Sequence, residues 1–70
     1  NKREEMVHQL ARDFEVTTVV AEKLFDCGFH SPEGVLHAEP AYFQTTTGLD
    51  EATVKEIYDH AQTIVDAKGE

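Results

Sequence analysis

Two stretches of this 70-residue chain decide its fold, residues 28–36 (GFHSPEGVL) and residues 46–54 (TTGLDEATV). In each, a glycine is followed by an apolar residue and then, one or two positions later, by a residue type that caps helices. Each stretch therefore predicts a sharp turn between two helices. The second turn, with Gly48, Leu49 and Asp50, has the form of a helix-hairpin-helix.

Apolar residues recur at the 3.6-residue period of a helix on both sides of these turns. The expected helices cover residues 2–14, a segment from Thr17 or Thr18 to Gly28, residues 32–38 after the cap Ser31, residues 41–46 after Pro40, and residues 51–67 after the cap Asp50. Strand-like alternation is missing from the sequence. We therefore expect an all-α fold, a compact five-helix bundle of two helix-hairpin-helix motifs of the SAM-like kind.

The expected core takes one apolar stripe from each helix. Its members are Met6, Val7, Leu10 and Phe14; Val20, Ala21, Leu24 and Phe25; Val35, Leu36 and Ala38; Phe43; and Val54, Ile57, Tyr58, Ala61, Ile64 and Val65. Val19, on the flank of the second stripe, is expected to be half buried.

A weak internal repeat supports the two-hairpin arrangement. When the chain is shifted by 33 residues, residues 16–24 overlay residues 49–57, and both copies begin with an apolar residue followed by a helix cap. Glu15 then stands where the second copy has Gly48. The repeat predicts two related hairpins, the first of which is degenerate.

Composition limits what this domain can do. Fourteen acidic and six basic residues give a net charge of −8, which repels phosphates at long range and disfavours direct binding of nucleic acid. The single cysteine excludes an internal disulfide, and the sequence has no membrane-spanning run. Residues 1–70 are interpreted as one domain, with a repeat core at about residues 14–65. The missing initial methionine indicates a fragment of a larger protein.

The phosphate-binding interpretation of the second turn has a specific difficulty. Free amides at residues 51–53 would suit an anion, but the Asp50 carboxylate would accept those same hydrogen bonds. Glu51 follows at once, and no basic residue comes before Lys55. A structural role for the turn is therefore the stronger interpretation.

Catalytic, metal and cofactor sites are not expected. The soft ligands Cys27, His30, His37 and His60 lack the paired spacing of a metal site. Ser31 is used as a helix cap, so no nucleophile, base and acid can be assembled around it. We expect no enzyme, no bound metal and no cofactor.

Surface recognition remains, in two versions. In one, the large residues Phe29, Val19, Tyr42 and Tyr58 are partly exposed and form an apolar centre with an acidic rim. In the other, Phe29 and Tyr58 belong to the core and Tyr42 is an isolated exposed aromatic. The residues alone leave both versions open.

Residues 14–65 resemble a known family. The run VAEKLFDCGFHSPEGVL at residues 20–36, then Pro40, then GLDEATV at residues 48–54, is similar to the C-terminal acidic repeats of the bacterial transcription elongation and termination factor NusA. The C-terminal domain of the RNA polymerase α subunit is a related paired-hairpin fold, but it uses basic residues that this chain lacks.

The resemblance implies a cytoplasmic, monomeric interaction module of a transcription factor. Its implied partners are the C-terminal domain of the RNA polymerase α subunit, phage antitermination proteins, or the RNA-binding domains of the same protein. As contact residues we predict Phe29 and Leu49, which anchor the turns, with Glu33, Asp50 and Glu51 as charge partners. A helix-hairpin-helix domain that binds nucleic acid is the alternative.

Overall fold

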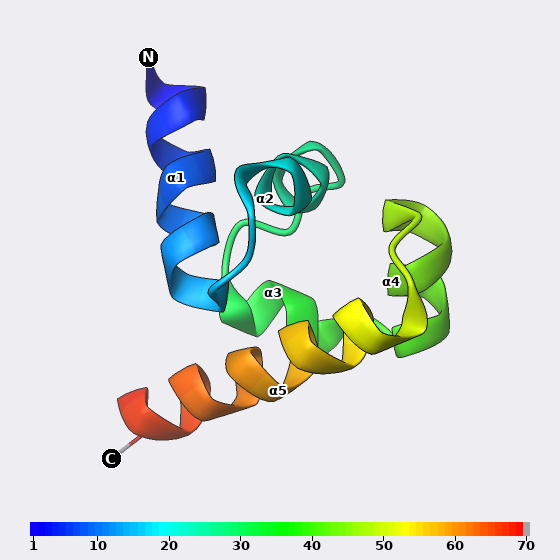
Figure 1. Ribbon diagram of the computed structural model, residues 1–70. Helices are drawn as coiled ribbons and strands as arrows, with labels where there is room; N and C mark the ends of the chain where they lie inside the picture. The colour runs from blue at the N-terminus through cyan, green and yellow to red at the C-terminus, as the bar shows by residue number, and fades with distance from the viewer. Residues whose placement is uncertain (70) are drawn as a thin grey trace.

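Five helices make up the protein in a computed structural model that describes residues 1–69 (Figure 1). They are α1 (Lys2–Phe14), α2 (Thr18–Asp26), α3 (Pro32–His37), α4 (Pro40–Thr47) and α5 (Glu51–Lys68). Residues 1–69 contain no strand, so the predicted all-α five-helix bundle is confirmed. None of these helices combines the length and the apolar character needed to cross a membrane.

The helices α2, α3 and α5 begin at the predicted side-chain caps. The hydroxyl oxygens of Thr17 and Ser31 and the carboxylate of Asp50 each accept a hydrogen bond from the backbone N–H three residues later. These bonds satisfy N–H groups that have no partner within the helix. Pro32 and Pro40 occupy the first positions of α3 and α4, where a missing N–H costs nothing.

Three residues in the left-handed conformation end the helices that precede a sharp turn. They are Glu15 (φ 54°), Gly28 (φ 89°) and Gly48 (φ 72°). At Gly28 the next amide, that of Phe29, bonds back to the Leu24 carbonyl at 2.9 Å, which closes a Schellman turn. Glu15 and Gly48 both lie in the left-handed region, so the two hairpins related by the repeat share a left-handed residue at this position.

The helices pack in pairs (Figure 1). In this view α2 lies against α1, and α3 lies against α5, which runs along the lower edge of the molecule. The helices α1 and α4 also contact α5. Since α5 touches three of the other helices, it is the element that connects the two halves of the bundle.

The core is formed by twelve buried apolar residues, with Phe43 of α4 completely enclosed. The Phe43 ring lies 4.8 Å from that of Phe29 and meets the Tyr58 ring edge-on at 5.3 Å, measured between ring centroids. The remaining buried residues are Val7, Leu10, Phe14, Ala21, Leu24, Val35, Leu49, Val54, Ile57 and Ala61. Each helix therefore contributes the stripe that its periodicity predicts, although not with every predicted member.

Two burial predictions are wrong. Met6 is 42% exposed rather than part of the core, and Val19 is 63% exposed rather than half buried. In a helix of 3.6 residues per turn, Met6 lies about a quarter-turn away from Val7, through which α1 packs. Val19 lies about half a turn away from Ala21, the residue that α2 buries, and so faces water.

Replacing Ile57 by alanine is expected to lower the free energy of unfolding by roughly 2–5 kcal/mol, because the side chain is fully buried and its removal leaves a cavity. Urea denaturation measures the loss. The control is Val19→Ala on the exposed face of α2, expected to change stability by less than about 0.5 kcal/mol. Equal losses in the two variants would contradict the core described above.

The left-handed turns predict opposite effects at equivalent positions. Gly48→Ala should destabilise the domain by roughly 1 kcal/mol, because alanine at positive φ is strained even though a Cβ there meets no atom within 4 Å. Glu15→Gly should stabilise it by up to about 1 kcal/mol by removing the same strain. Thermal unfolding of both variants checks this, and a stabilising Gly48→Ala change would refute the strain argument.

Candidate functional site

The two predicted turn anchors belong to the core. Phe29 is 7% exposed and Leu49 is 8% exposed, and the Phe29 ring packs on Phe43. Tyr58 is half buried, whereas Tyr42 is 62% exposed. The second version of the surface prediction therefore describes Phe29 and Tyr42, whereas Tyr58 is only partly buried against the core. Phe29 and Leu49 hold their turns in place from inside.

Asp50 is engaged at the start of α5. Its carboxylate accepts hydrogen bonds from the Thr53 hydroxyl at 2.5 Å and from the Thr53 amide at 3.4 Å. The hydroxyl bond is the main reason why the pKa of this carboxyl lies below its usual value of 3.8. An anion at this helix end would have to displace a carboxylate that the protein itself supplies.

The other two predicted carboxylates lie far apart. The Glu33 carboxylate is 3.7 Å from the Lys68 ammonium at the far end of α5, an exposed pair of small energetic value. Glu51 is exposed at the first position of the same helix. At 1.5 Å per residue, roughly 25 Å of helix separate Lys68 from Glu51, so Glu33 does not share a site with Asp50 and Glu51.

A groove between α4 and α5, hereafter the α4–α5 groove, is the feature of the surface that the sequence did not predict. It encloses about 470 Å³, and most of its exposed wall is apolar. Its lining includes Pro40, Ala41 and Gln44 of α4 and Val54 and Tyr58 of α5. A further set of charged residues forms its rim, namely Glu51, Lys55 and Asp59.

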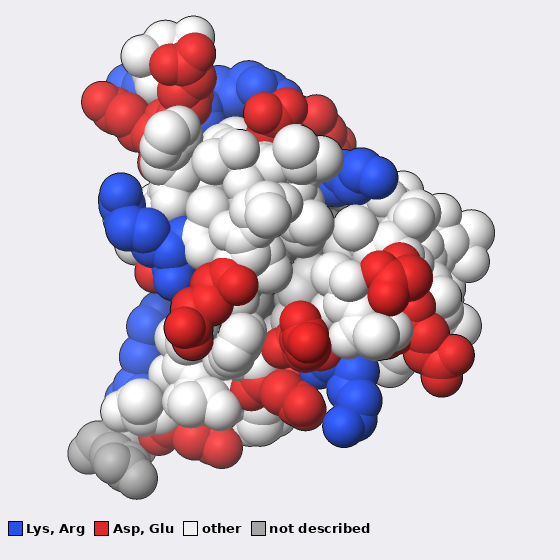
Figure 2. All heavy atoms as spheres, viewed as in Figure 1, with Lys and Arg blue, Asp and Glu red and all other residues white. Residues whose placement is uncertain are grey.

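The groove lies in an acidic segment of the chain. Residues 39–59 carry five acidic side chains and one basic one, Lys55, so this segment holds half of the net charge of −8. Figure 2 shows acidic atoms spread over this whole face, including α4 and the first part of α5, while most of the basic atoms in that view lie toward α1 and α2. The apolar wall of the groove therefore has an acidic surround.

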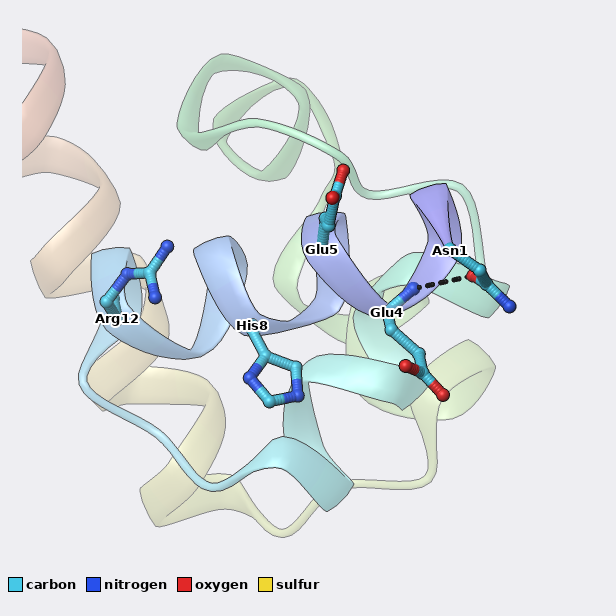
Figure 3. A pocket seen from close by; sticks show the side chains of 5 residues that line it. All are labelled: Asn1, Glu4, Glu5, His8 and Arg12. Atoms are coloured by element: carbon cyan, nitrogen blue, oxygen red, sulfur yellow. Dashed lines mark hydrogen bonds between the residues drawn. The ribbon is translucent and has the colours of Figure 1, made fainter.

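A second hollow, of about 260 Å³, lies over α1 and is lined by Asn1, Glu4, Glu5, His8 and Arg12. Figure 3 shows Glu4 and His8 directed to one side of the helix, and Glu5 and Arg12 to the other. The Asn1 side chain is engaged as the cap of α1, accepting from the Glu4 amide at 3.1 Å. These residues extend along α1 from its cap, Asn1, to Arg12 in its last turn, and their functional groups do not converge on a common point.

The candidate metal ligands are dispersed. Within residues 1–69 no three His, Cys, Asp or Glu side chains are grouped as a metal site would require. The half-buried Cys27 thiol donates to the Thr46 carbonyl at 3.4 Å, and the His30 ring stacks on Phe25 with centroids 4.5 Å apart. Both side chains thus have structural contacts of their own.

His60 was expected on the solvent-exposed polar face of the last helix, but the structure partly buries it. It is half buried, with Nε2 3.5 Å from a carboxylate oxygen of Glu15. Its buried Nδ1 has no hydrogen-bond partner among the described residues. The reason is the packing of α5 against the α1–α2 turn, which covers part of this ring.

The basic residues needed for nucleic-acid binding are not gathered at the second hairpin. Lys2, Arg3 and Arg12 lie on α1, as predicted. The Arg3 guanidinium makes two hydrogen bonds to the Asp26 carboxylate, at 3.0 and 3.1 Å, and this pairing raises the pKa of the arginine. Lys55 is the one basic residue among those that line the α4–α5 groove.

The ionised cap predicts a pH-dependent effect of Asp50→Asn. Because folding lowers the pKa of this carboxyl, its stabilising contribution is complete above 3.8 and is lost as the pH falls through the lower folded-state value. The variant should therefore have a lower urea midpoint than the wild type near neutral pH, and the difference should shrink below pH 3.8. Asp59→Asn, which removes a charge from a residue that does not cap a helix, is the control. A difference independent of pH would contradict the assignment.

Comparisons of this chain with protein-family models, with curated proteins and with solved structures find no match.

Proposed function

We propose that this domain is a protein-interaction module of a bacterial transcription elongation, termination or antitermination factor, related to the acidic repeats of NusA. It docks on RNA polymerase or on its regulators through an acidic surface. The observation that carries the proposal concerns the second hairpin. The N-terminus of α5, where a phosphate would bind, is capped by Asp50, and the adjoining α4–α5 groove is apolar with acidic residues around it.

The Asp50 cap separates this hairpin from one that grips a phosphate. Helix-hairpin-helix proteins of that kind need free amides at the start of the second helix, together with nearby basic side chains. Here the Asp50 carboxylate accepts hydrogen bonds from the Thr53 amide and hydroxyl, and the next residue, Glu51, is also acidic. A phosphate would meet two negative charges instead of a vacant helix end.

Charge and shape support a protein partner instead. An apolar centre surrounded by polar and charged residues is the usual layout of a protein contact, and charge complementarity steers the encounter. The α4–α5 groove has this layout, with Val54 and Tyr58 inside and Glu51 and Asp59 at the rim. A partner with a basic surface is the one that this arrangement favours.

The resemblance of residues 14–65 to the acidic repeats supplies the candidate partners. The first is the C-terminal domain of the RNA polymerase α subunit, whose DNA-contacting surface is basic. The others are antitermination proteins and the RNA-binding domains of the same factor. The proposal places the protein in the cytoplasm, in keeping with a single cysteine that stays free.

The test is a pair of NMR titrations of the isotope-labelled domain. One adds the C-terminal domain of the RNA polymerase α subunit, and the other adds duplex and single-stranded nucleic acid. We expect shifts with the protein alone, concentrated on α4 and α5, and weakened by added salt because the attraction is electrostatic. Glu51→Lys should weaken the binding, while Glu56→Lys, with the same charge change on an exposed residue outside the groove, should weaken it less.

The alternative function has a different outcome. Binding of nucleic acid with a steep salt dependence would favour the nucleic-acid-binding helix-hairpin-helix and overturn the proposal. The absence of binding to the polymerase domain would remove that partner and direct the search to antitermination proteins or to an intramolecular contact.

A further inference from the structure

The walls of the α4–α5 groove are held in place before any partner arrives. The Tyr58 hydroxyl donates a hydrogen bond of 2.7 Å to the Ala38 carbonyl, and the Tyr58 ring packs edge-on against Phe43. Burial raises the pKa of this hydroxyl, which therefore keeps its proton and remains a donor. Across the groove, the pyrrolidine ring of Pro40 has a fixed backbone angle. A ligand would not have to order these side chains.

The size and lining of the groove fit one or two aliphatic side chains. A volume of about 470 Å³ is in the range of small-molecule pockets, roughly 300–1,000 Å³, but the groove is open to solvent. It presents no buried polar group that would orient a small polar molecule. An open groove between two helices suits the apolar side of an incoming helix.

The acidic residues around the groove indicate that its ligand is positively charged. Glu51 and Asp59 stand on the rim, and Glu39 and Asp50 immediately precede the groove residues Pro40 and Glu51 in the chain. Lys55 alone opposes them. A second copy of this chain, with its net charge of −8, would be repelled, and so would a nucleic acid.

We propose that the α4–α5 groove binds an amphipathic helix of a partner protein, with an aliphatic side chain inserted between Ala41 and Tyr58 and flanking Lys or Arg residues paired with Glu51 and Asp59. This inference rests on the proposed function, because it names the part of the acidic surface that makes the contact and the chemistry of the segment that enters it.

The chain offers a matched pair of variants. Ala41 and Ala52 are both exposed, and each is the second residue of its helix, α4 or α5. Changing either to lysine adds one positive charge at the same helix position. Only Ala41 lines the groove. A difference between Ala41→Lys and Ala52→Lys therefore isolates the groove from long-range charge effects.

The experiment uses two synthetic helical peptides of equal length and equal lysine content. One has a leucine stripe, and in the other each leucine is replaced by alanine. We expect the leucine peptide to bind the wild-type domain at least tenfold more tightly than the alanine peptide, with shifts at the amides of Ala41, Val54 and Tyr58. Ala41→Lys should lower the affinity for the leucine peptide by about tenfold or more, which is the effect expected when a contact at the centre of an interface is lost. Ala52→Lys should weaken it by less than about threefold, as expected of a charge at the rim.

Other outcomes overturn the inference. Equal binding of the two peptides, equal effects of the two variants, or no binding of the leucine peptide would each show that the groove does not receive an aliphatic side chain. The partner is tested separately with the polymerase domain. If that domain binds with shifts outside the groove, the groove assignment fails and the proposed function stands. If the leucine peptide occupies the groove and the polymerase domain does not bind, the proposed polymerase contact fails and the groove assignment stands.

Discussion

The packing of Phe43 between Phe29 and Tyr58 is the interaction on which the rest of this structure depends. It joins the turn that follows α2, the short helix α4 and the long helix α5 in one aromatic cluster. An eight-residue helix such as α4 has little stability of its own, so its position is set by this burial. The same contact orients Tyr58, whose hydroxyl binds the Ala38 carbonyl. The wall of the α4–α5 groove is thus an outer surface of the core.

Local signals account for most of what the sequence could predict. Caps such as Ser31 and Asp50, and turn residues such as Gly48, act within a few positions of themselves, so they place helix ends without knowledge of the fold. Burial is different, since Met6 has an apolar side chain but lies beyond the face that α1 buries. His60 shows the reverse case, because α5 brings it against the turn that contains Glu15.

The candidate site could be predicted only in part, because its shape depends on how the helices pack and not on local sequence signals. Glu51 is exposed beside the second turn, as its position in the sequence predicts, and it lines the groove. Phe29 and Leu49 each follow a glycine at a turn, and this same position explains their burial, because the turn directs both side chains into the core. The groove joins residues of two helices, and its existence depends on how α4 rests on α5. Periodicity within either helix contains no such information.

We propose that the acidic second hairpin is a docking surface for a basic helix and that the Asp50 cap keeps anions from the N-terminus of α5. The most direct measurement is a set of intermolecular nuclear Overhauser effects between the labelled domain and the unlabelled C-terminal domain of the RNA polymerase α subunit. The account predicts contacts from aliphatic protons of the partner to the Tyr58 ring and the Ala41 methyl group. Contacts confined to α1 and α2, with none at the α4–α5 groove, would contradict it.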